Sequence, residues 1–109
     1  MNRHIEFTVE RLTPEDGRAQ VDGRVCESAI RVGDVFTKVY GHKQRWDSKQ
    51  WVDIDPGPTH MVRLVIQSID SYRRLWDELS PGMSARLTLI GDGLDMLSEG
   101  RILGDDHAA

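Results

Sequence analysis

The sequence has few of the features that would assign a chemistry directly. Its 109 residues include one cysteine and only 6% aromatic residues, and no apolar run approaches the roughly 18 residues that a membrane-spanning helix needs. A single cysteine excludes an internal disulfide framework and a cysteine-based zinc cluster. The phosphate-binding pattern G-x-x-x-x-G-K-[ST] does not occur. The formal net charge of -4 argues against a strongly basic nucleic-acid-binding domain, but it is compatible with a local basic patch.

The length corresponds to one ordinary domain. A chain of this size buries about two-thirds of its unfolded surface, so it needs no metal or disulfide to fold. We expect a single domain over residues 1–109, with its core at about 5–103 and a flexible tail over 104–109. The start is unlike a signal peptide, because Met1 is followed almost at once by alternating residues. We therefore expect a cytoplasmic, bacterial protein with no membrane partner.

Apolar residues recur at every second position, which is the period of half-buried strands. The first run contains Ile5, Phe7 and Val9, and a second contains Ala19, Val21 and Val25. Further runs lie at 29–32, 35–40, 62–66, 85–89 and 101–103. Turn residues such as those at 14–17, 33–34 and 81–82 separate these runs, and a turn or 3₁₀ piece is expected at 94–98. Short strands with closely spaced turns predict a sandwich or a barrel.

The segment 72–79 is ambiguous. Ile69, Tyr72, Leu75, Trp76 and Leu79 fit the spacing of a helix face, and several good helix formers lie among them. From the residues alone, a helix and an extended segment are both open.

The segment 41–60 interrupts the alternation. It contains two tryptophans, two prolines and balanced charge. We expect a long loop whose centre forms a small hairpin that pairs Arg45-Trp46-Asp47 with Gln50-Trp51-Val52. The tryptophans either supply a contact surface for a partner or fold back to cap one end of the barrel.

Four pieces of the sequence, in order, resemble domain 2 of translational GTPases such as elongation factor Tu. Residues 23–34, GRVCESAIRVGD, are similar to the family's G-R-V-x-x-G-x-I-x-V-G-D segment. Residues 65–69 resemble the strand that leads into a basic turn, and residues 81–91 resemble P-G-x-x-V-x-L-x-L-x-G. Residues 99–103 resemble the family's closing segment. The match extends from about Ile5 to Leu103.

The resemblance implies an all-β fold, namely a single Greek-key β-barrel of six to seven strands. It also favours a strand and turn over a helix at Tyr72–Leu79. The sequence departs from the family in three places: one glycine near residue 19 is lost, Ser28 replaces a glycine, and residues 41–60 are longer than the usual strand pair. The nucleotide-binding domain has no counterpart, so GTP hydrolysis is not implied.

No group of residues suggests catalysis or a cofactor. The four histidines, at positions 4, 42, 60 and 107, lack metal-ligand spacing, and Cys26 has no base beside it in the sequence. The carboxylates at 53, 55, 92, 95 and 99 do not match a calcium-binding loop. We therefore expect a protein that is not an enzyme and binds no cofactor or metal.

The candidate partner-binding residues fall into two groups. Trp46 and Trp51, with Lys43 and Arg45, could form a protein-contact surface. Arg63, Arg73 and Arg74, together with Arg86, could contact RNA phosphates, as the family does on the ribosome. The first hypothesis is a protein-interaction module, and the second is a translation-associated RNA or ribosome binder. A third is an immunity or antitoxin-type protein, since a small acidic domain suits a basic toxin.

Overall fold

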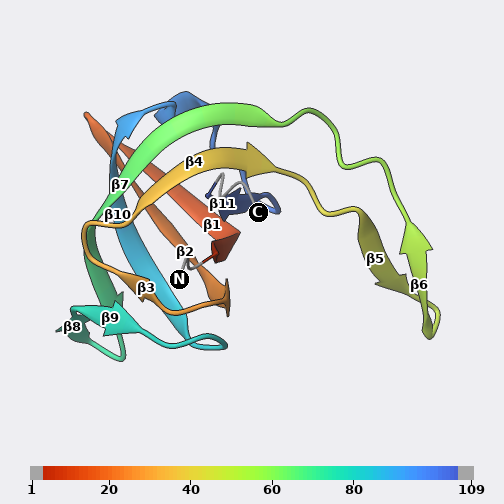
Figure 1. Ribbon diagram of the computed structural model, residues 1–109, viewed down its shortest axis with the longest axis horizontal. Coiled ribbons are helices and arrows are strands. Elements are labelled where there is room, and N and C mark those ends of the chain that lie inside the picture. Colours follow the sequence, from red (N-terminus) through yellow and green to blue (C-terminus); the bar gives the residue numbers. More distant parts are fainter. Residues whose placement is uncertain (1–3, 106–109) are drawn as a thin grey trace.

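The computed structural model describes residues 4–105 and shows a closed barrel of six antiparallel strands (Figure 1). Around the barrel the strand order is β10 (Ser84–Asp92), β2 (Arg18–Glu27), β1 (Ile5–Glu15), β11 (Ile102–Gly104), β4 (Val35–Tyr40) and β7 (His60–Ser71), and β7 pairs again with β10 to close the ring. A seventh strand, β8, pairs with the end of β7. This arrangement confirms the predicted all-β barrel of six to seven strands.

The elements follow the predicted alternating runs. The barrel strands are β1 (Ile5–Glu15), β2 (Arg18–Glu27), β4 (Val35–Tyr40), β7 (His60–Ser71), β10 (Ser84–Asp92) and β11 (Ile102–Gly104). The smaller elements are β3 (Ile30–Arg31), which pairs with β9 (Glu78–Leu79), β5 (Gln44–Asp47), which pairs with β6 (Gln50–Asp53), β8 (Arg74–Trp76) and a 3₁₀ turn at Leu94–Met96. No helix within residues 4–105 has the length and apolarity needed to cross a membrane.

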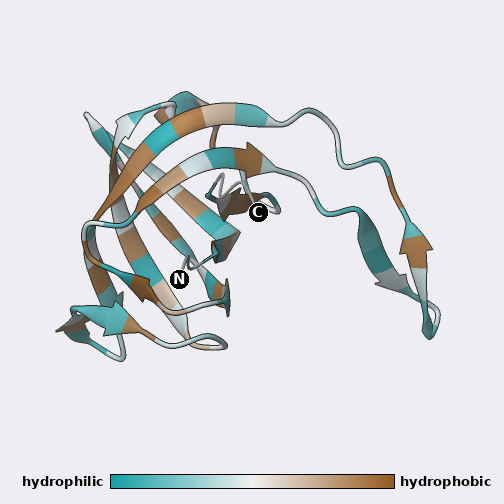
Figure 2. Ribbon diagram, viewed as in Figure 1, coloured by the Kyte–Doolittle hydropathy of each residue, from teal (hydrophilic) through white to brown (hydrophobic). Residues whose placement is uncertain are grey.

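The barrel interior is filled by the apolar member of each alternating pair. Figure 2 shows hydrophobic and hydrophilic bands that alternate along the barrel strands. Phe7, Val21, Phe36, Leu64 and Leu87 are fully buried, each contributed by a different strand. Burial of a side chain of this kind stabilises the fold by about 1.5–3 kcal/mol. The outward residues are mostly charged or polar, as the sequence predicts.

The first hairpin bends sharply at Gly23. The register between β1 and β2 shifts after Val9, which leaves Glu10 as the extra residue of a β-bulge. A Cβ atom at Gly23 would lie 1.8 Å from the carbonyl oxygen of Thr8. Glycine is therefore required here by the close approach of the two backbones, which is the crowded barrel corner predicted for this position.

Residues 72–79 form a turn and short strands, which confirms the strand and turn that the resemblance favours; the helix that the spacing left open is wrong. Tyr72 and Arg73 form a two-residue turn in which both have positive φ, 54° and 63°. The chain then returns as β8 and β9. Tyr72 and Leu75, which the helical spacing placed on an apolar face, are instead 79% and 73% exposed.

The C-terminal end of the described chain is part of the barrel. Gly104 ends β11, and the buried carboxylate of Asp105 accepts a hydrogen bond from the backbone N–H of Ile5 at 3.3 Å. The expected flexible tail is therefore wrong at these two residues, because pairing and burial hold them. Residues 106–109 lie outside the described residues.

Candidate protein-interaction surface

Residues 41–59 form an arm that leaves the barrel between β4 and β7 and projects away from it (Figure 1). At its base the backbones of the two limbs run so close together that a Cβ atom added at Gly41 would lie 2.0 Å from the carbonyl oxygen of Pro56. Farther along the arm, the backbone N–H of Ile54 donates to the carbonyl of Lys43 at 2.9 Å. The absence of a side chain at Gly41 allows this close approach.

The guanidinium of Arg101 joins the arm to the barrel. It donates to the carbonyl oxygen of Pro56 at 3.2 Å and to that of Pro58, both on the returning limb. It also donates to the carbonyl of Val39, in β4, at 3.4 Å. One side chain near the C-terminal strand thus holds the base of the arm at three carbonyl oxygens.

The outer part of the arm is the β5–β6 hairpin, at the residues where the sequence suggested one. Its register pairs Gln44 with Asp53, Arg45 with Val52, Trp46 with Trp51 and Asp47 with Gln50. The two-residue turn consists of Ser48 and Lys49, both with positive φ. Positive φ at both positions matches the twist of a tight hairpin, although glycine or asparagine is the usual residue there.

Trp46 and Trp51 are exposed rather than folded onto the barrel. Their side chains are 60% and 64% exposed, and their ring centroids lie 5.4 Å apart at an interplanar angle of 72°. The alternative in which they cap the barrel end is therefore wrong. The base of the arm directs the hairpin away from the core, so the indoles contact each other instead.

An open cavity of about 750 Å³ lies between the arm and the end of the barrel. We call this cavity the crook. It is lined by residues of four barrel strands and of the arm: Glu6, Glu27, Tyr40, Gly41, His42, Lys43, Gln44, Asp53 and Ile102. Gln44 and Asp53, which face it, are joined by a hydrogen bond of 2.9 Å.

The barrel side of the crook is built by polar contacts. The hydroxyl of Tyr40 donates to the carboxylate of Glu6 at 2.7 Å, and the ammonium of Lys38 lies over the Tyr40 ring. Burial, followed by the hydrogen bond to Glu6, raises the pKa of the Tyr40 phenol above its usual value. His4 contacts Asp105 at 2.7 Å and Glu6 at 3.4 Å. These contacts hold the Glu6 carboxylate in the lining of the crook.

The predicted basic residues do not form one cluster. Arg73 and Arg74 lie at the β7–β8 turn, where Arg74 stacks over the ring of Trp76 at 4.3 Å. Arg63 lies on β7, ten residues before Arg73, and ten residues of extended chain span about 30 Å. Lys43 and Arg45 belong to the arm, where Arg45 is 3.9 Å from Asp47.

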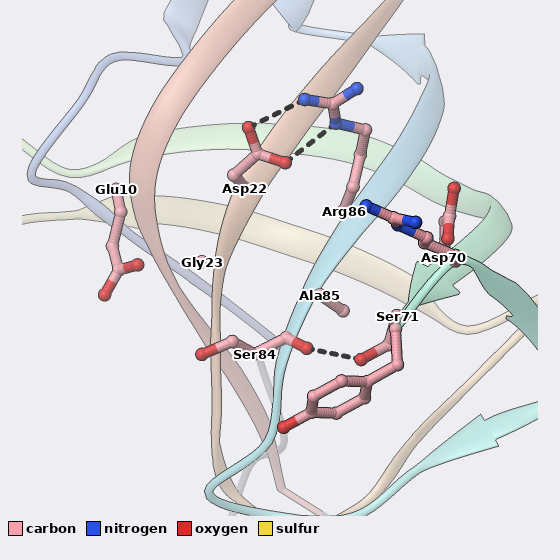
Figure 3. A pocket seen from close by; sticks show the side chains of 10 residues that line it. Glu10, Asp22, Gly23, Asp70, Ser71, Ser84, Ala85 and Arg86 are labelled. Carbon is pink, nitrogen blue, oxygen red and sulfur yellow. Dashed lines mark hydrogen bonds and ion pairs between the residues drawn. The ribbon is translucent and has the colours of Figure 1, made fainter.

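Arg86 is engaged in an ion pair within the barrel wall. Its guanidinium contacts the carboxylate of Asp22 at 2.8 Å, and this pair raises the pKa of Arg86. Figure 3 shows the pair beside a shallow groove over Gly23 and Ala85, where the Ser71 hydroxyl also donates to the carbonyl of Ser84. The Asp22 carboxylate therefore offsets the positive charge that Arg86 would bring to a phosphate.

Several of the other residues considered for a metal or nucleophilic site have structural contacts. Within residues 4–105, no three histidine, cysteine, aspartate or glutamate side chains are grouped to hold a metal ion. Glu99 accepts a hydrogen bond from the backbone of Leu12, and Asp55 accepts one from Gly57. The thiol of Cys26 lies 3.5 Å from the hydroxyl of Thr8. His107 lies outside the described residues.

Sequence reasoning missed Arg101 and the carboxylates of the crook. Glu6 and Glu27 are polar members of alternating strands, and Arg101 directly precedes the last strand, so none of the three stands out in the sequence. Their role arises from the barrel closure, which brings three distant segments to the base of the arm. Tyr72 and Leu75 were missed as surface residues because their spacing imitates a helix.

The barrel is similar to part of solved translation elongation factors. Elongation factor SelB from Methanococcus maripaludis, in its apo form, superimposes with a TM-score of 0.69 and 14% identity, over 99% of this chain and 20% of that chain. The same factor in complex with the GTP analogue GPPNHP gives 0.68 and 13%, over 99% and 21%. This chain therefore spans about a fifth of the length of the factors it matches.

The likeness is one of structure. No protein-family model matches the sequence, and no curated protein matches it. The strand order and the superposition over almost the whole chain nevertheless agree with the sequence motifs at residues 23–34 and 81–91. The chain has the β-barrel fold of domain 2 of the translational GTPases.

Proposed function

We propose that the chain is a non-enzymatic module that binds a partner protein through its arm, in the cytoplasm. The observation that supports this function is the exposure of Trp46 and Trp51 on a hairpin that projects from a barrel with a well-buried core. Tryptophan is the residue type most enriched at the energetic centres of protein interfaces. Two adjacent exposed indoles form an apolar patch of the kind that marks a binding site.

The arm is also held in advance of binding. Arg101 fixes its base, and the cross-strand ladder fixes the positions of the two indoles. A preorganised surface loses less conformational entropy on association, so more of its contact energy appears as affinity. Lys43 and Arg45, on the same arm, would supply polar contacts to the partner.

The test is capture of a partner from a cytosolic extract by the immobilised protein. The variant Trp46→Ala/Trp51→Ala should lose the captured protein. A matched control, Met61→Ala/Leu75→Ala, removes two equally exposed apolar side chains outside the arm and should retain it. Equal capture by all three proteins would show that the arm is not the binding surface.

A second candidate function is translation-associated binding of RNA or the ribosome through Arg73 and Arg74. It is supported by the barrel's likeness to an elongation-factor domain and by the exposed Tyr72 ring beside these arginines. Phosphate contacts weaken as salt rises, and two of them predict a roughly tenfold loss of affinity between 50 and 200 mM salt. Arg63, distant from this turn, would contribute only to an extended RNA contact.

Cosedimentation with ribosomes at the two salt concentrations measures this effect. The variant Arg73→Gln/Arg74→Gln should abolish the salt-dependent fraction, while Arg18→Gln on another turn should not. Salt-independent cosedimentation, or none, would exclude this second function.

A further inference from the structure

The indole pair lies on the same face of the hairpin as two residues that line the crook, and we call this face together with the crook the concave surface. In the β5–β6 ladder, residues directly opposite each other share a face, and alternate residues along a strand return to it. Gln44, Trp46, Trp51 and Asp53 therefore lie on the same face of the hairpin. Because Gln44 and Asp53 line the crook, this is the face of the arm that turns toward the barrel. A bound segment would contact the indoles and the barrel end together.

This concave surface carries more negative than positive charge. Glu6, Glu27 and Asp53 contribute three carboxylates to the crook, against one lysine, Lys43. The hydrogen bonds from Tyr40 to Glu6 and from Gln44 to Asp53 come from neutral donors, so they leave the negative charge in place. Glu6 also contacts the imidazole of His4 at 3.4 Å, whereas Asp53 has no such contact with a histidine in the described residues. Glu27 forms no ion pair with another residue of the described chain, and its backbone has a φ of 67° at the end of β2.

We propose that the occupant of the crook is an extended segment of a partner protein that carries lysine or arginine side chains among apolar ones. This inference rests on the proposed function and specifies the chemistry of its partner. The apolar side chains would pack on Trp46 and Trp51, whose exposed ring faces also attract a cation. The basic side chains would reach the carboxylates of Glu6, Glu27 and Asp53.

The same charges disfavour two other occupants. RNA would bring phosphates toward three carboxylates, and juxtaposed like charges oppose association. A second copy of the arm would bring as many carboxylates (Asp47, Asp53 and Asp55) as cations (Lys43, Arg45 and Lys49), so it has no net complementarity. A basic segment is the occupant that the charges of the crook match.

The test uses a displayed library of random 12-residue peptides selected on the wild-type protein, with Trp46→Ala/Trp51→Ala as the subtracted background. Peptides specific to the wild type should be enriched in lysine and arginine and depleted in aspartate and glutamate. The best peptide is then titrated against wild type, Glu27→Gln and Asp53→Asn, with tryptophan fluorescence as the readout. Asparagine at position 53 keeps an oxygen that can accept the hydrogen bond from Gln44.

Each carboxylate variant should bind the peptide with an affinity about three- to tenfold lower than that of wild type at low salt. This difference in affinity should shrink at high salt, because ions screen exposed charges. The matched control, Asp16→Asn, removes a carboxylate from a turn outside the crook and should bind like wild type. Equal binding by the crook variants and wild type would overturn the proposal.

The selection also separates this inference from the proposed function. Wild-type-specific peptides without basic enrichment would overturn the basic-segment proposal and leave arm-mediated protein binding standing. Absence of any wild-type-specific peptide would overturn both. If sedimentation showed that the wild-type protein alone is a dimer and that Trp46→Ala/Trp51→Ala is a monomer, the crook would be assigned to a second copy of the chain. Tryptophan-dependent binding of polyuridylic acid would reassign it to RNA.

Discussion

Trp46 and Trp51 lie directly opposite each other across the β5–β6 ladder, and their indole rings meet edge to face at 5.4 Å. Each ring therefore covers part of the other, while the remainder of both stays in solvent. Cross-strand aromatic pairs contribute about 0.5–1.5 kcal/mol beyond their burial. This contribution stabilises the arm and leaves the barrel core unaffected, because neither ring belongs to the core cluster.

The first prediction concerns the stability of Trp46→Ala/Trp51→Ala. Because both rings are mostly exposed, their removal should change the thermal midpoint of the barrel by less than about 3 °C. Differential scanning calorimetry measures this midpoint. A fall of about 10 °C or more would mean that the tryptophans pack on the barrel in solution.

The second prediction concerns Arg101→Met, which removes three hydrogen bonds at the base of the arm. Hydrogen bonds from a charged donor contribute about 1.5 kcal/mol or more. Amide hydrogens of residues 44–53 should therefore exchange about tenfold faster, while barrel amides such as that of Leu87 should keep their protection. Arg18→Met, which breaks an exposed ion pair with Glu15, is the control and should leave the arm unchanged. Unaltered exchange in Arg101→Met would show that the arm is held by other contacts.

The barrel could be predicted from the sequence because its signal is local and repeated. Ile5, Phe7 and Val9 alternate with polar residues, and the structure buries all three. The hairpin at 72–73 could not be predicted from its own residues, because its turn uses tyrosine and arginine at positive φ, with no glycine or asparagine to mark it. Only the resemblance to the GTPase domain favoured a strand and turn there. The direction of the tryptophans could not be predicted either. It depends on the close approach of Gly41 to Pro56 and on Arg101, which lies far from both tryptophans in the sequence and contacts the arm only after the barrel closes.

The third prediction concerns Gly23→Ala. A methyl group here would meet the backbone oxygen of Thr8 at 1.8 Å and the ring of Phe7 at 2.8 Å, and neither can move without disturbing the β1–β2 bulge. The substitution should lower the free energy of unfolding by about 3 kcal/mol or more, measured by urea unfolding. Gly17→Ala is the control: its φ of 72° is unfavourable, but there is no atom within 4 Å, so the loss should be only about 1 kcal/mol.

The fourth prediction concerns the pH dependence associated with Tyr40. Its pKa is raised in the folded state, mainly by burial and then by the Glu6 carboxylate, so folding favours the neutral phenol. The contribution of this group to stability is therefore fully present below about pH 10, the unfolded pKa, and is lost as pH rises toward the folded pKa. The difference in urea midpoint between wild type and Tyr40→Phe should shrink between about pH 10 and pH 12.

A direct titration checks the same pKa shift. The chain has two tyrosines, so in Tyr72→Phe the absorbance change of phenolate formation reports Tyr40 alone. Its midpoint should lie above pH 10, the ordinary value for tyrosine. A midpoint at or below that value would contradict both the burial of the phenol and its hydrogen bond to Glu6.

The fifth prediction compares the two tight turns that lack glycine. Tyr72 and Arg73 occupy left-handed backbone positions that cost an ordinary residue about 1–2 kcal/mol. Replacing them with Asn-Gly should raise the free energy of unfolding by about 1–2 kcal/mol, because β8 pairs with β7 of the barrel sheet. The same replacement at Ser48 and Lys49 should leave global stability unchanged, because the β5–β6 hairpin pairs with no barrel strand. It should instead slow amide exchange within the arm. Equal gains in global stability at both turns would show that the arm unfolds together with the barrel.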